Sequence, residues 1–186
     1  MNLSRFVASS FVALAFVAGP AAAQTSDKAK KQEEVLKAAE VSLADFYKAE
    51  PKIKTMVDKA PGYAVFKTYG LSFLLGGAGG KGVVYERATK KHTYMDLALA
   101  SAGAQIGASD TRYLFIFKDT KDLRQFIDSG WDANVAGGGS AGTGSKTAGS
   151  AEGAFTGGAL YTLTKAGLQA GGAAAGAKAW KDKELN

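Results

Sequence analysis

The segment between Ser26 and Ala60 carries two stripes of apolar residues at helical spacing. Apolar residues recur every three or four positions in each stripe, which is the pattern of an amphipathic helix. Pro51 falls between the stripes, and a proline suits the first turn of a helix because its missing N–H would be unpaired there anyway. We therefore predict two helices with a break at Glu50-Pro51, the second ended by Pro61-Gly62. The stripes consist of Leu36, Ala39, Leu43 and Phe46 or Tyr47, and of Ile53, Met56, Val57 and Ala60.

Beyond Gly62 the pattern changes to short alternating segments, which predict β-strands. Thr111–Phe117 (TRYLFIF) is the clearest, because it is aromatic and β-branched with little charge. Residues Ala136–Ser150 (AGGGSAGTGSKTAGS) are compatible with a loop or with a weak pair of strands. The other predicted strands are Tyr63–Tyr69, Leu71–Leu75 continuing through a run of glycines to Tyr85, Thr93–Ala108, and Ala154–Thr164 and Leu168–Trp180 with Lys165-Ala166-Gly167 as their hairpin turn.

One short helix interrupts the strands. Asp119 or Thr120 can cap its start, and Gly130 is a left-handed stop. Of the 24 glycines, 22 lie between Gly70 and Gly176, and glycines in strands are typical of close backbone approach or strong curvature. The predicted fold is α+β: N-terminal helices, then a glycine-rich, strongly curved, mostly antiparallel sheet with one inserted helix. The apolar face of that helix consists of Leu123, Phe126 and Ile127.

The first 23 residues have the pattern of a secretory signal peptide. Arg5 precedes an apolar run from Phe6 to Ala18, and Ala21-Ala22-Ala23 is a small-residue cleavage site. We expect cleavage after Ala23, export to the bacterial periplasm, and one globular unit made of a helical segment (24–60) and a β-rich domain (61–186). The mature chain would carry 22 basic and 17 acidic residues, a net charge of +5, which suits an anionic membrane surface.

Residues with metal-binding or catalytic chemistry are scarce. The chain has no cysteine, and its one histidine, His92 in ATKKHTY, is interpreted as an exposed turn residue. This composition leaves no typical transition-metal site and gives no support for a Ser-His-Asp triad. The carboxylates form no paired-acid motif. We therefore predict a protein that is not an enzyme and uses no metal or cofactor, and we expect no nucleic-acid partner.

The glycine run Leu74–Val84 (LLGGAGGKGVV) suggests a phosphate-binding loop at first sight. A P-loop fails at two fixed positions, because Leu75 stands where the first glycine belongs and Gly82 where the hydroxyl belongs. Gly77-x-Gly79-x-x-Gly82 matches a dinucleotide fingerprint, but that motif requires a helix directly afterwards. Val83-Val84-Tyr85 predicts a strand instead. The run is therefore interpreted as a strand that bends where a side chain would not fit.

Five motifs follow one another along the chain: PGYAVF (61–66), GGAGGKGVVYER (76–87), GAQIG (103–107), Trp131 after the short helix, and YTLTKAGLQAGGAAAG (161–176). Together they resemble the SYLF domain family, whose lipid-binding eukaryotic members include a yeast actin-patch protein. The resemblance covers roughly Ala60 to Ala177 and identifies the chain as similar to an exported bacterial branch of the family. It implies binding to phospholipid membranes, with anionic bacterial phospholipid as the expected ligand; actin binding, implied for one eukaryotic branch, is not expected here.

The expected function is a peripheral phospholipid-binding module, with basic side chains on head groups and a shallow aromatic anchor. Alternatives stay open for each candidate: the helix lysines form a solvated face, Arg87 pairs with a carboxylate, and Trp131 belongs to the core. Lys81 is the least explained by structure, since a glycine run offers a lysine few neighbours. Two rival functions are a structural or protein-interaction module and, less favoured, a small outer-membrane β-barrel. The candidate lipid-binding residues are Lys81, Arg87, Lys52, Lys54, Lys59 and Trp131.

Overall fold

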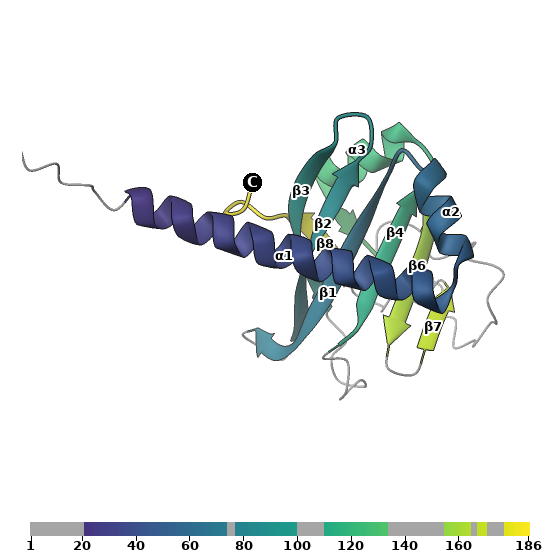
Figure 1. Cartoon of the computed structure of the whole chain (residues 1–186), viewed down its shortest axis with the longest axis horizontal. Coiled ribbons are helices and arrows are strands. Elements are labelled where there is room, and N and C mark those ends of the chain that lie inside the picture. Colours follow the sequence, from purple (N-terminus) through teal and green to yellow (C-terminus); the bar gives the residue numbers. More distant parts are fainter. Residues whose placement is uncertain (1–20, 74–76, 100–109, 134–154, 165–166, 171–176) are drawn as a thin grey trace, which may run out of the picture.

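In the part of the chain that the structure describes, eight antiparallel strands form one curved sheet in the order β5-β8-β3-β2-β1-β4-β6-β7 (Figure 1). The computed structural model describes residues 21–73, 77–99, 110–133, 155–164, 167–170 and 177–186. The strands are β1 (Gly62–Phe73), β2 (Gly77–Glu86), β3 (Lys91–Leu99), β4 (Arg112–Phe117), β5 (Trp131–Asp132), β6 (Gly158–Thr164), β7 (Gly167–Ala170) and β8 (Ala177–Lys181). The helices are α1 (Ala21–Ala49), α2 (Lys52–Lys59) and α3 (Thr120–Ser129). The predicted α+β class is confirmed.

The two N-terminal helices follow the predicted stripes. They separate at Glu50-Pro51, and Ile53, Val57 and Phe46 are almost completely buried against the sheet. Met56 departs from the prediction, because it is 37% exposed at the edge of the buried stripe. Burial of side chains of this size contributes roughly 1.5–3 kcal/mol each. The stripes therefore attach α1 and α2 to the sheet.

The sheet is apolar on both faces and has a helical layer on each. β4 is buried along most of its length, with alternate side chains on opposite faces. Leu114 and Ile116 pack with α1 and α2, whereas Phe115 and Phe117 pack with α3. Figure 1 shows α1 and α2 in front of the sheet and α3 behind it. We call the first side the α1 face and the second the α3 face.

The inserted helix α3 begins and ends as predicted. The Asp119 carboxylate accepts a hydrogen bond from the backbone N–H of Asp122 at 2.8 Å, which caps the first turn. Gly130 ends the helix with φ of 74°, in the left-handed region where a side chain is strained. A Cβ at Gly130 would also collide with the carbonyl oxygen of Ala179. The cap and the stop direct the chain from α3 into β5.

The glycine run of β2 is a strand in close contact with its neighbour. A Cβ on Gly80 would collide with the carbonyl of Lys67, and one on Gly82 would meet the carbonyl of Val65 and the ring of Phe66. The strand continues to Glu86, so no helix N-terminus follows the glycines. The interpretation of this run as a strand without room for side chains is confirmed at Gly80 and Gly82. The prediction that Leu71–Leu75 continues through the glycines to Tyr85 as one strand is wrong, because residues 71–73 belong to β1 and β2 starts at Gly77, antiparallel to it.

The prediction of a single last strand, Leu168–Trp180, is wrong. Residues 167–170 form β7, which pairs with β6 at one edge of the sheet. Residues 177–181 form β8, which pairs with β3 and β5 near the other edge. Strand order separates the two halves, and local alternation carries no information on strand order. The predictions for the signal peptide up to residue 20, Ala136–Ser150, GAQIG and the turn residues 165–166 lie outside the described residues.

Replacing Gly82 by alanine should destabilise the protein. The added Cβ has to displace the Val65 carbonyl and the Phe66 ring, and overpacking of this kind costs about 1–3 kcal/mol. Urea denaturation of Gly82→Ala should show a lower midpoint with an unchanged slope. An unchanged midpoint would contradict the close approach of β1 and β2.

Candidate functional site

Lys81 is held by two carboxylates on the α1 face. Its Nζ lies 2.8 Å from Asp96 Oδ1 on the adjacent strand and 2.5 Å from Asp182 Oδ2, directly after β8. The Asp182 side chain is only 4% exposed. The expectation that Lys81 has few neighbours was wrong, because strand pairing brings in partners 15 and 101 residues away in sequence. The charge of Lys81 is compensated within the fold.

Asp182 belongs to a short segment, Asp182–Asn186, which we call the C-terminal clip. Leu185 is 2% exposed and packs against Val35, Val83 and Tyr94. The side chain of Asn186 bonds both backbone groups of Tyr94, at 3.0 and 2.7 Å. From α1, Gln32 Nε2 donates to the Leu185 carbonyl at 2.7 Å and Lys28 Nζ to the Asn186 carbonyl at 2.9 Å. The clip therefore joins α1 to β3.

The ion pair shifts the pKa of both partners. Burial alone would raise the pKa of Asp182, but hydrogen bonds from Lys81 and from the N–H groups of Leu185 and Glu184 outweigh it and lower the pKa below its ordinary 3.8. Burial alone would lower the pKa of Lys81, but hydrogen bonds to Asp182 and Asp96 raise it above 10.5. The ionised carboxylate of Asp182 stabilises the fold above pH 3.8, and this stabilisation is lost as the pH falls through its lowered pKa in the folded protein. The ammonium of Lys81 stabilises the fold below pH 10.5, and this stabilisation is lost as the pH rises through its raised pKa in the folded protein.

Asp182→Ala should lower the free energy of unfolding by about 3 kcal/mol at neutral pH, because it leaves Lys81 with one partner and frees the clip. The loss should shrink as pH falls through the pKa of Asp182 in the folded protein. Urea denaturation across acidic pH measures both effects. Asp128→Ala is the matched control: Asp128 is 71% exposed and lies 3.6 Å from Lys181, so its removal should change stability by less than about 0.5 kcal/mol. Equal losses in the two variants would contradict the role of the clip.

Arg87 joins the β2–β3 turn to the end of α2. Its Nε donates to the Ala60 carbonyl at 2.9 Å and its Nη2 to the Val57 carbonyl at 2.7 Å. Its backbone N–H donates to the Pro61 carbonyl at 2.9 Å. The last carbonyls of a helix have no partner within the helix, so the guanidinium caps α2. Arg87 forms no ion pair with a carboxylate in the described part of the chain, so its charge is uncompensated there.

Arg87→Lys should lower stability by about 1 kcal/mol although it keeps the charge, because a single ammonium does not reproduce the two-pronged guanidinium contact. Thermal or urea denaturation measures the loss. Arg124→Lys is the control, since Arg124 is 64% exposed and makes one contact of 3.4 Å with Glu86. No difference between the two variants would contradict the capping role.

Four cations gather around this turn, and we call them the basic end: Lys59, Arg87, Lys90 and Lys91. The hydrogen bonds of Arg87 place the end of α2, with Lys59, beside the turn 87–90. All four are exposed, and Lys90 has a left-handed backbone with φ of 56°. Of the nearby carboxylates, Asp58 pairs with Lys54 and Glu86 with Arg124. Lys59, Lys90 and Lys91 have no ion-pair partner within the residues described, so the basic end is a surface of positive charge.

An aromatic row lies beside the basic end on the α1 face: Tyr63, Tyr85 and His92. They are neighbours across β1, β2 and β3, each next to the end of its strand. The ring centroids of Tyr63 and Tyr85 are 5.4 Å apart, and those of Tyr85 and His92 5.2 Å. Burial raises the pKa of Tyr47 on α1 to about 12, with smaller contributions from Tyr63 and Asp58. The Tyr47 hydroxyl therefore stays protonated. His92 is exposed as predicted, but it lies in β3 rather than in the turn.

The remaining candidates are spread over the molecule. Lys52 and Lys54 are exposed on α2, and Lys54 pairs with Asp58 at 2.7 Å. Trp131 is 8% exposed and packs under α3 with Phe115 and Phe155. It is therefore a core residue, as the alternative interpretation held. The structure therefore brings Lys59 and Arg87 together but places Lys81 and Trp131 elsewhere. Sequence reasoning missed Lys90 and Lys91, although two adjacent lysines in a predicted turn were a usable signal.

No protein-family model matches the chain. It is similar to a curated protein named Beta cell expansion factor A from Aeromonas veronii, with 34% identity over 148 residues. The match covers 79% of this chain and 56% of that protein, so the chain spans little more than half the length of this relative. Among the described helices, none is both long and apolar enough to cross a bilayer.

Proposed function

We propose that this chain is a SYLF-type module without enzymatic activity that binds the surface of anionic phospholipid membranes in the bacterial cell envelope. The observation that supports the proposal best is the basic end. Lys59, Lys90 and Lys91 are exposed and lack an ion-pair partner among the described residues. The adjacent Arg87 is held in place by the end of α2.

Electrostatic attraction is the main term in the proposed mechanism. A lysine or arginine near an anionic bilayer contributes roughly 1 kcal/mol, so four of them contribute on the order of 4 kcal/mol at low salt. Because Debye screening shortens the reach of these charges, the attraction weakens as salt is added. Lys52 on α2 adds a further exposed cation, whereas Lys54 is partly neutralised by Asp58.

The aromatic row supplies the second term. Tyrosine has an apolar ring and a polar hydroxyl, and such side chains are enriched at the level of lipid head groups. Tyr63 and Tyr85 are half-buried beside Arg87, which places two amphipathic rings next to the cations. In this proposal Lys81 and Trp131, expected from the sequence to touch lipid, instead stabilise the fold.

Location and family are part of the same proposal. A signal peptide cleaved after Ala23 would deliver the mature chain to the periplasm, where it meets anionic bacterial phospholipid. The SYLF-like motifs PGYAVF and GGAGGKGVVYER supply residues 62–66 of β1 and 77–86 of β2, the strands next to the basic end. The similarity to Beta cell expansion factor A adds no ligand, because that name specifies none.

Charge reversal at the β2–β3 turn tests the function. The mature chain should co-sediment with anionic vesicles of phosphatidylglycerol and phosphatidylcholine at low salt, and less so at high salt or with phosphatidylcholine alone. Lys90→Glu/Lys91→Glu should weaken binding at least tenfold, because two attractive charges become repulsive. Arg87→Lys should bind like the unmodified protein, since its charge is kept.

Lys30→Glu/Lys31→Glu is the matched control. It reverses an adjacent, exposed lysine pair on α1, away from the turn, and should reduce binding much less. Equal loss in both double variants would contradict the placement of the site at the basic end. Absence of binding to every vesicle would exclude the lipid function and favour a protein-interaction module.

A further inference from the structure

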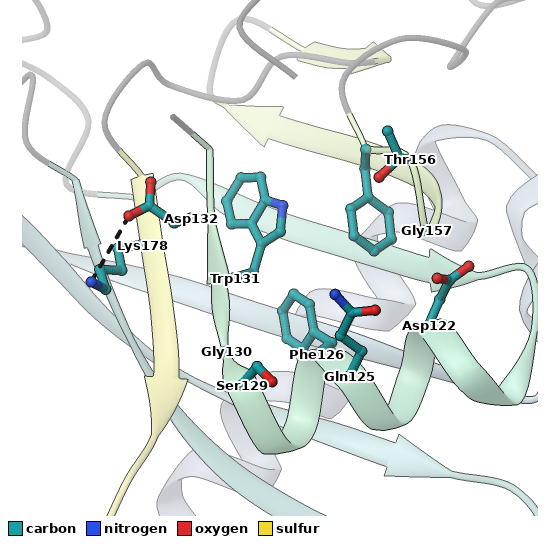
Figure 2. A pocket seen from close by; sticks show the side chains of 11 residues that line it. Asp122, Gln125, Phe126, Ser129, Gly130, Trp131, Asp132, Thr156, Gly157 and Lys178 are labelled. Carbon is teal, nitrogen blue, oxygen red and sulfur yellow. Dashed lines mark ion pairs between the residues drawn. The ribbon is translucent and has the colours of Figure 1, made fainter. Parts of the chain in front are cut away.

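A pocket of about 470 Å³ opens on the α3 face, and no residue of the basic end lines it. It lies between α3, the short strand β5, and the residues that lead into β6 (Figure 2). Pockets of this size hold small organic molecules. The lining residues are Asp122, Gln125, Phe126, Ser129, Gly130, Trp131, Asp132, Phe155, Thr156, Gly157 and Lys178.

Aromatic rings form the apolar part of the pocket. The Trp131 and Phe155 rings meet edge to face at 6.4 Å and 82°, and those of Phe126 and Phe155 at 6.2 Å and 84°. Trp131 also packs edge to face on Phe115, at 5.1 Å and 70°. Rings locked in this arrangement provide a preformed apolar wall, which suits a flat apolar ligand.

The indole N–H of Trp131 is an unsatisfied polar group at this wall. Trp131 is 8% exposed, and its Nε1 is buried without a hydrogen-bond partner in the part of the chain that the structure describes. In Figure 2 the indole nitrogen lies on the ring edge turned away from Asp132 and Lys178, toward the side lined by Gln125 and Thr156. A buried N–H without a partner costs about 1–3 kcal/mol, which a ligand acceptor would recover.

The charges around the pocket compensate one another. Asp132 lies 3.8 Å from Lys178. Asp122 Oδ2 lies 3.2 Å from Lys118, which is outside the lining, although this buried oxygen makes no hydrogen bond in the described part of the chain. An ionic ligand would have to compete with these pairs. The arrangement therefore favours an uncharged molecule.

We infer that this pocket is a binding site for a neutral, flat apolar molecule that carries a hydrogen-bond-accepting oxygen, such as a ketone, ester or amide carbonyl. The rings of Trp131, Phe126 and Phe155 contact its apolar body, and the oxygen accepts the Trp131 N–H after a small shift of the indole edge. This inference is independent of membrane binding, since it uses none of the residues of the basic end.

The test uses the fluorescent naphthalene ketone Prodan, without vesicles, and its analogue 6-propyl-2-dimethylaminonaphthalene, in which a CH2 group replaces the carbonyl. The chain has two tryptophans, so Trp180→Phe leaves Trp131 as the only tryptophan donor for energy transfer. Trp180 is 41% exposed on the α1 face, so Trp180→Phe is the matched control for Trp131→Phe. We expect saturable Prodan binding with energy transfer in Trp180→Phe, and binding about fivefold weaker for the analogue, the effect of one hydrogen bond.

Two variants decide the outcome. Trp131→Phe removes the N–H and should bind Prodan about fivefold more weakly, while leaving the analogue unaffected. Gln125→Phe, at an exposed position of α3 that lines the pocket, should block both probes without altering the core, and it keeps the test valid if Trp131→Phe does not fold. No saturable binding, or binding that Gln125→Phe leaves unchanged, would overturn the inference. Equal affinity of the two probes for the unmodified protein would overturn the assigned hydrogen bond.

Discussion

The structure depends on a sheet whose central strands are apolar on both faces. Successive residues of β1 and β4, such as Val65 and Phe66 or Leu114 and Phe115, point to opposite sides, and all four are buried. A sheet of this kind is stable in water only when both faces are covered. This requirement explains why α1 and α2 occupy one face and α3 the other.

The two helical layers are attached in different ways. α3 follows β4 directly, so a cap at Asp119 and a stop at Gly130 are sufficient to place it. α1 is long and projects past the sheet (Figure 1), and its contact with β3 depends on a distant segment, the C-terminal clip. The ion pair of Lys81 with Asp182 fixes that clip, so a residue that resembles a ligand-binding lysine in the sequence contributes to folding instead.

The basic end results from the same architecture. Arg87 ties the β2–β3 turn to the carbonyls of α2, which holds cations from two chain segments at one end of the sheet. A rigid support of this kind reduces the ordering cost of binding an extended anionic surface. The pocket at Trp131 lies on the α3 face, where packed rings and a buried N–H provide a different chemistry. The fold thus carries both a charged surface and a pocket with an aromatic wall, built from different residues.

The sequence by itself determined the features that depend on neighbouring residues: the two helical stripes and their break at Pro51, the cap and stop of α3, the strand at TRYLFIF, and the absence of a phosphate loop. Hydrophobic period, caps and glycines are local signals, so one sequence is sufficient to read them. Only the tertiary structure decided the separation of β7 from β8, the partners of Lys81, the burial of Trp131 and the union of Lys59 with the β2–β3 turn. Each of these depends on strand order and on contacts between residues far apart in the chain, which local periodicity does not encode.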